Sequence, residues 1–122
     1  MGDTTPRKVA IVDDDDAVRD SLRFLLEAAG YSVAAFASGA ELLHTMPRPF
    51  ICLIVDQHMP QMTGLDLVAR LRQSGETTPV LLISGSPSPA IAERAATLGV
   101  AQVLEKPADD DALLDFVSSA AR

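Results

Sequence analysis

The length of 122 residues suits a single compact domain, and a composition of 48% apolar and 22% charged residues excludes an intrinsically disordered chain. The 10 basic and 17 acidic residues give a net charge of -7, which argues against direct binding of nucleic acid or anionic lipid. The single cysteine, Cys52, excludes an internal disulfide, and no apolar run has the length of a signal peptide or a membrane span. We therefore expect one domain over residues 1–122, with residues 1–7 flexible, in a cytoplasmic location.

Five short apolar runs, spaced about twenty residues apart, predict buried strands that alternate with helices. The predicted strands are Lys8–Asp13, Ser32–Phe36, Ile51–Asp56, Pro79–Ser84 and Ala101–Leu104. A β-α pattern repeated five times is typical of an α/β fold with a doubly wound parallel sheet and helices on both faces.

Capping patterns mark the predicted helices in chain order. The first helix carries apolar residues at helical spacing from Val18 to Ala29 and is followed by Gly30, a residue suited to a left-handed cap. Ser38 with Glu41 forms a capping-box pattern, which opens a short second helix that ends before Pro47.

The remaining three helices have similar signals. Thr63 with Asp66 repeats the capping pattern and opens the third helix. Ser88 followed by Pro89 suits the N-cap and first position of the fourth helix, and the last helix is expected to start near Asp109.

Polar residues occur where the buried strands end. Asp13 and Asp14 end the first strand, Asp56 the third and Ser84 the fourth, while Lys106 follows the fifth. Because ligands of open α/β sheets bind outside the carboxyl ends of the strands, we expect these five side chains to share one pocket. Three clustered carboxylates need compensating cations, and acidic oxygen-rich sites suit Mg²⁺.

This set of residues favours phosphoryl transfer. A carboxylate can attack phosphorus and form an acyl phosphate, and Asp56 is the candidate nucleophile. The phosphoryl oxygens would need a divalent ion on one side and fixed donors on the other, for which Lys106 supplies a positive charge and Ser84 a hydroxyl.

The chain from about Lys8 to its end resembles the receiver domains of two-component response regulators. The matching segments are Ile11-Val12-Asp13-Asp14-Asp15-Asp16, Leu53-Ile54-Val55-Asp56-Gln57-His58-Met59-Pro60-Gln61-Met62-Thr63-Gly64, Leu82-Ile83-Ser84-Gly85 and Leu104-Glu105-Lys106-Pro107. The resemblance implies a flavodoxin-like fold with five helices and strand order 2-1-3-4-5. It also implies a phosphorylation-dependent switch that accepts a phosphoryl group from a histidine kinase or a phosphotransfer protein.

The resemblance also assigns roles to individual residues. Asp14, Asp56 and the backbone carbonyl of His58 would bind Mg²⁺ or Mn²⁺ directly, and Asp13 would act through water. Ser84 would be the switch hydroxyl, and Lys106 would hold the phosphoryl group, with a cis Lys106–Pro107 peptide bond. The domain would catalyse its own phosphorylation and dephosphorylation without being a free-standing enzyme.

Two positions differ from the usual pattern of these receiver domains. Val103 stands where most members have a Tyr or Phe that moves inward during switching, and Ala108 stands where many have Phe. Val103 would therefore modulate the switch. A homodimer through the face of the fourth helix, fifth strand and last helix is a further expectation, and its contacts cannot be copied from other members.

Alternative interpretations exist for several of these residues. The acidic run from Asp13 to Asp16 also suits a simple helix N-terminus, and Asp15 and Asp16 need no other role. His58, two positions after Asp56, is expected to modulate the lifetime of the phosphorylated form by tuning the access of water.

The function has two rival interpretations. The first is a phosphohydrolase of the haloacid dehalogenase type, although such enzymes need a second Asp where His58 stands, and their acidic pair follows the nucleophile. The second is a phosphate-independent interaction module, which Val103 and Ala108 suggest.

Overall fold

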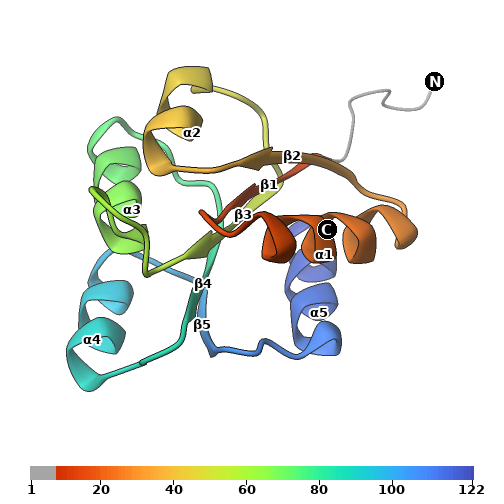
Figure 1. Ribbon diagram of the computed structural model, residues 1–122. Coiled ribbons are helices and arrows are strands. Elements are labelled where there is room, and N and C mark those ends of the chain that lie inside the picture. The colour runs from red at the N-terminus through yellow and green to blue at the C-terminus, as the bar shows by residue number, and fades with distance from the viewer. Residues whose placement is uncertain (1–7) are drawn as a thin grey trace.

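The computed structural model describes residues 8–122 (Figure 1), so the expected flexibility of residues 1–7 lies outside the described part of the chain. In chain order the elements are β1 (Lys8–Val12), α1 (Asp16–Ala28), β2 (Ser32–Phe36), α2 (Gly39–Thr45), β3 (Cys52–Asp56), α3 (Gly64–Gln73), β4 (Val80–Ser84), α4 (Pro89–Thr97), β5 (Gln102–Glu105) and α5 (Asp110–Ala120). No helix in this part of the chain has the length and apolar character needed to cross a bilayer.

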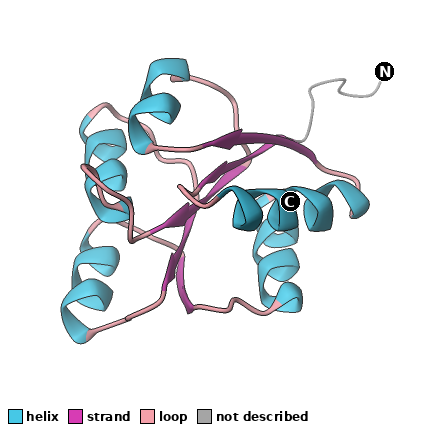
Figure 2. Cartoon of the chain, in the orientation of Figure 1, coloured by secondary structure: helices cyan, strands magenta, loops and turns pink. Residues whose placement is uncertain are grey.

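The strands form one parallel sheet in the order β2-β1-β3-β4-β5. Helices α1 and α5 cover one face, and α2, α3 and α4 cover the other (Figures 1 and 2). The predicted doubly wound, flavodoxin-like α/β fold with five strands and five helices is confirmed.

Four of the five predicted strands differ from the observed bounds by one residue. The first, third and fourth predicted strands each include one residue too many, and the fifth is shifted by one. The cause is that hydrogen bonding continues just beyond the strand ends: the Asp13 N–H donates to the Phe36 carbonyl at 3.1 Å, and the Pro79 carbonyl accepts from Leu53 at 2.9 Å.

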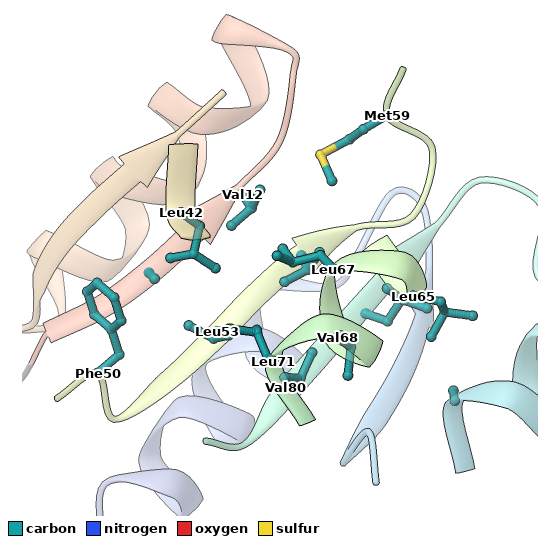
Figure 3. Packing of buried hydrophobic residues seen from close by; sticks show 14 residues of the cluster. Val12, Leu42, Phe50, Leu53, Met59, Leu65, Leu67, Val68, Leu71 and Val80 are labelled. Atoms are coloured by element: carbon teal, nitrogen blue, oxygen red, sulfur yellow. The ribbon is translucent and has the colours of Figure 1, made fainter. Parts of the chain in front are cut away.

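Side-chain alternation along the buried strands builds two cores, one on each face of the sheet. On β1, Ala10 and Val12 point toward α2 and α3, whereas Val9 and Ile11 point toward α1 and α5. Figure 3 shows the first core, in which Leu53 from β3 lies among apolar side chains of α2 and α3. The sheet is thus held on both faces, and its carboxyl edge offers a fixed platform.

The predicted helix starts agree with the structure in most details. The Thr63 hydroxyl accepts from the Asp66 N–H, and the Asp66 carboxylate accepts from the Thr63 N–H, which completes the capping box of α3. Ser88 and Asp109 cap α4 and α5. In α2, Ser38 is the N-cap, but the Glu41 carboxylate accepts from the Ala37 N–H and not from Ser38, so only half of that predicted box forms.

Candidate functional site

The residues that the sequence singled out come together at the carboxyl edge of the sheet. Asp13 and Asp14 follow β1, Asp56 ends β3, Ser84 ends β4 and Lys106 follows β5. These four strands are neighbours in the sheet, and because all run parallel, their ends lie side by side.

Three carboxylates form an acidic cluster at this edge. One oxygen from each of Asp13, Asp14 and Asp56 lies within 4.8 Å of the other two. Asp13 is 2% exposed and Asp56 is 3% exposed, whereas Asp14 is open to solvent. Burial, together with the negative charges of Asp56 and Asp14, raises the pKa of Asp13 despite the hydrogen bond from the Asp15 N–H and the attraction of Lys106.

Lys106 supplies the positive charge beside this cluster. Its Nζ lies 2.9 Å from Oδ1 of Asp56, and about one third of the lysine side chain is exposed, at 34%. Burial alone would lower the pKa of Lys106, but contact with Asp56 and the charges of Asp13 and Asp14 outweigh it and raise the pKa. The ammonium group therefore stays charged at neutral pH.

The Asp56 carboxylate has unused capacity to bind a cation. Its Oδ1 is buried and has the Lys106 ammonium at 2.9 Å as its close partner. One lysine cannot neutralise three clustered carboxylates, so the site favours a further cation. The donor set, made entirely of acidic oxygens, fits a hard divalent ion such as Mg²⁺.

The backbone around the cluster is fixed by the sheet and by α1. The Asp13 carboxylate accepts from the Asp15 N–H at 2.9 Å, and Arg19 donates to the Asp13 carbonyl at 2.5 Å. Across the sheet, the Lys106 N–H donates to the Ser84 carbonyl at 2.9 Å. No short sequence pattern indicates this hydrogen bond from Arg19, so it was not predicted.

The loop between β3 and α3 is anchored by two residues that received no role from the sequence. The buried Gln57 side chain accepts from the Leu65 N–H at 2.9 Å, and the Gln57 carbonyl accepts from the Gly64 N–H at 3.1 Å. A Cβ on Gly64 would lie 2.6 Å from the Asp56 carbonyl oxygen, so only glycine permits this approach. The glycine in the matched segment was the available signal for this packing.

Ser84 and His58 are joined by a contact that the sequence did not predict. The Ser84 hydroxyl is fully buried, accepts from the Ser86 N–H at 3.1 Å and lies 3.0 Å from Nε2 of the exposed His58. Within residues 8–122, no hydrogen bond uses the His58 backbone carbonyl, the predicted metal ligand.

The other predicted features lie near the same edge. The Lys106–Pro107 peptide bond is cis, and so is Met46–Pro47, which was not expected. Val103 is half-buried and packs against the core of the α3 side. Ala108 helps to line an open cavity of about 480 Å³ beside Lys106, and α1 forms one side of this cavity.

Comparison with known proteins identifies the family. Residues 9–118 match the family model described as "Response regulator receiver domain". The chain belongs to the response regulator receiver domain family. Over 98% of its length it is 37% identical to the transcriptional regulatory protein FixJ of Bradyrhizobium diazoefficiens, and the match covers 58% of that protein. Over 92% of its length it is 35% identical to the response regulator protein TodT of Pseudomonas putida, and the match covers 50% of that protein.

Solved structures agree with this assignment. The receiver domain superposes on the chemotaxis protein CheY4 of Vibrio cholerae with a TM-score of 0.86 at 30% identity, covering 95% of this chain and 99% of that one. The family match excludes the haloacid dehalogenase alternative. The chain spans about half the length of the curated relatives that it matches, and a single domain over residues 1–122 stays a prediction.

Proposed function

We propose that this receiver domain is a phosphorylation-dependent switch in which Asp56 accepts a phosphoryl group from phosphohistidine of a histidine kinase or a phosphotransfer protein. An Asp56 carboxylate oxygen attacks phosphorus, the P–N bond breaks, and the donor imidazole leaves with the bonding electron pair. The product is an acyl phosphate, which water later hydrolyses back to the free carboxylate.

The chain's own residues serve this transfer by charge and by position. Lys106, held next to Asp56, stabilises negative charge on the incoming phosphoryl oxygens, and the Ser84 hydroxyl donates to one of them after phosphorylation. The sheet fixes the backbone of both residues, so only their side chains have to move when charge develops.

A divalent ion, Mg²⁺ or Mn²⁺, belongs to the proposed site. Asp14, Asp56 and the His58 carbonyl would hold it directly, and Asp13 would hold it through water. When bound, the ion neutralises the acidic cluster and the phosphoryl oxygens. Three convergent carboxylates with only one lysine beside them support this assignment.

The pairing of Lys106 with a buried carboxylate inside the acidic cluster is the observation that carries the proposal. A structural acidic cluster could be balanced by a cation at any of its carboxylates, whereas here the lysine contacts Asp56, the carboxylate proposed as the nucleophile. A phosphate-independent interaction module would not require the cation at that particular carboxylate.

Incubation with a small phosphodonor such as acetyl phosphate and Mg²⁺, followed by intact mass measurement, tests the proposed function. We expect one added phosphoryl group, absent in Asp56→Asn and absent when a chelator removes the metal. Equal modification of Asp56→Asn, or no modification of the wild type, would contradict the proposal and favour the phosphate-independent module.

The partners follow from the same proposal. A phosphohistidine donor must dock at the carboxyl edge of the sheet, in the same compartment as this chain, and the predicted cytoplasmic location stays a prediction. A second copy is proposed to bind through α4, β5 and α5, because β5 is an edge strand with unpaired backbone groups. Sedimentation with and without beryllofluoride, a phosphoryl mimic, tests this dimer, and an unchanged mass would contradict it.

A further inference from the structure

The Ser84 hydroxyl is engaged away from Asp56. It has two hydrogen-bond partners, the Ser86 N–H at 3.1 Å and the His58 imidazole Nε2 at 3.0 Å, and the residue has no exposed surface. Within residues 8–122, no hydrogen bond joins Ser84 to Asp56. The hydroxyl that the proposed function needs at the phosphoryl group is thus held elsewhere before phosphorylation.

Counting donors shows why these two arrangements compete. A hydroxyl has one proton to donate and two lone pairs, and one lone pair already accepts from Ser86. If Nε2 of His58 is unprotonated, the hydroxyl donates its proton to His58 and has none left for a phosphoryl oxygen. If Nε2 carries a proton, it donates to Ser84 and fixes the oxygen in place. In both tautomers the bond to His58 opposes movement of the hydroxyl.

We propose that His58 is a positioning residue that holds the Ser84 hydroxyl in the unphosphorylated state, and that phosphorylation of Asp56 releases it. This inference rests on the proposed function and deepens it. It assigns His58 a structural partner, which differs from the sequence-based expectation that His58 tunes the access of water.

His58 links the buried Ser84 hydroxyl to the surface of the protein. His58 is exposed and lies in the loop between β3 and α3, whereas Ser84 is buried at the end of β4. Residue 103 on β5 is valine, which offers no aromatic ring to move into space that Ser84 vacates. A released His58 side chain therefore carries the change from Ser84 to the surface of the β3–α3 loop.

A matched pair of substitutions isolates the Nε2 contact. The Gln side chain of His58→Gln places a polar atom at about the reach of Nε2, whereas Asn in His58→Asn is too short. Both variants keep the backbone carbonyl of residue 58. In the metal-free protein, three-bond NMR couplings at Ser84 should show one side-chain rotamer in the wild type and in His58→Gln, and rotamer averaging in His58→Asn. A single unchanged rotamer in His58→Asn would overturn the inference.

Binding of beryllofluoride in the presence of Mg²⁺ measures the competition directly. Because one hydrogen bond no longer has to break, His58→Asn should bind this mimic roughly two- to tenfold more tightly than the wild type, with His58→Gln close to the wild type. In a Ser84→Ala background the same His58→Asn change should have no effect, because the hydroxyl is gone.

The outcomes separate the two levels of the proposal. Equal affinity of wild type and His58→Asn, or a His58→Asn effect that persists without the Ser84 hydroxyl, overturns the positioning role alone. Failure of the wild type to bind beryllofluoride overturns the proposed function, and the inference falls with it.

Discussion

Asp13 is a buried member of the acidic cluster whose charged form is disfavoured in the folded state. It is almost fully buried, and its pKa is raised by that burial and by neighbouring carboxylates. The folded protein therefore takes up a proton at Asp13 more readily than the unfolded chain does. As the pH rises from about 4 through the raised pKa of Asp13, this residue lowers the free energy of unfolding.

Replacing Asp13 by Asn should increase the free energy of unfolding at neutral pH by about 1 kcal/mol when no divalent metal is present. The amide oxygen can still accept from the Asp15 N–H, while the like charge is removed. Urea unfolding at several pH values measures this gain, which should shrink as the pH falls toward 4. Added Mg²⁺ should stabilise the wild type more than the variant.

The control for this prediction is Asp20→Asn, which removes the same charge from an exposed position on α1. Its unfolding free energy should change little in either condition. A metal-free Asp13→Asn variant no more stable than the wild type at neutral pH would contradict the electrostatic interpretation of the cluster.

Gly64 is the second residue whose identity the site demands. A methyl group there would meet the Asp56 carbonyl oxygen at 2.6 Å and a Leu82 methyl at 2.7 Å. We expect Gly64→Ala to lower the free energy of unfolding by about 1–3 kcal/mol, although alanine favours the helix that begins there. Gly85→Ala, whose Cβ would have no heavy atom within 4 Å, is the control. Equal urea midpoints for the two variants would contradict this prediction, because they would show that the structure accommodates a methyl group at position 64 without losing stability.

At the scale of one element, α3 depends on its first turn. The Thr63 N–H and the Arg94 guanidinium both contact the Asp66 carboxylate, and these contacts lower its pKa. The charged form of Asp66 is thus favoured in the folded state, so its stabilising contribution is present above about pH 4 and is lost as the pH falls through the lowered pKa.

Asp66→Asn should lower the free energy of unfolding at pH 7 by about 0.5 kcal/mol, a small effect because both side chains of this ion pair are about half exposed to solvent. The difference from the wild type should close on acidification below pH 4, as measured by urea unfolding. Glu93→Gln removes a charge on α4 that makes no ion pair within the described residues, so it should show no such pH dependence. If the difference in unfolding free energy between wild type and Asp66→Asn stayed constant with pH, the lost stability would come from the geometry of the cap and not from the charge.

At the scale of the whole molecule, Arg72 ties distant segments together. Its guanidinium donates to the carbonyls of Leu98, Glu76, Thr78 and Gly99 at 2.9, 3.0, 3.0 and 3.4 Å. The end of α3, the approach to β4 and the turn after α4 therefore meet at one side chain. Partial burial of this group lowers its pKa, although the neighbouring Glu76 opposes that shift.

Arg72→Lys should lower the free energy of unfolding by about 1–3 kcal/mol, because an ammonium cannot reach several carbonyls in the planar fork of a guanidinium. Arg70→Lys, on the exposed side of the same helix, is the matched control and should be nearly neutral. Urea unfolding compares the two, and equal losses would show that Arg72 has no special role in joining these segments.

How much of this molecule the sequence predicted depends on how far apart the interacting residues lie. Strand periodicity and helix caps are local signals, so the fold and most helix starts were predictable, with errors of one residue where hydrogen bonding outlasts the strand. The convergence of Asp13, Asp56 and Lys106 was also predictable, because parallel strand ends share one edge.

The contacts that the sequence did not predict are tertiary contacts, which follow no repeating pattern in the sequence. His58 and Ser84 are 26 positions apart, and so are Arg72 and Leu98. A spacing of this size does not indicate that two residues are in contact. Such contacts depend on the length of the side chains and on the conformation of the loops that carry them. The Gln57 contact with α3 is closer in sequence, yet it depends on how the loop folds back.

The hydrogen bond from the Lys106 N–H to the Ser84 carbonyl affects how fast the Ser84 hydroxyl can change its position. It pins the main chain of Ser84 to the neighbouring strand, so the hydroxyl reorients chiefly by rotation about a single bond. Side-chain rotations and short loop adjustments take place within nanoseconds to microseconds. Under the proposed function, the rate of signalling is then set by how often Asp56 receives a phosphoryl group and how long the acyl phosphate lasts, because rotation of the Ser84 side chain is faster than either.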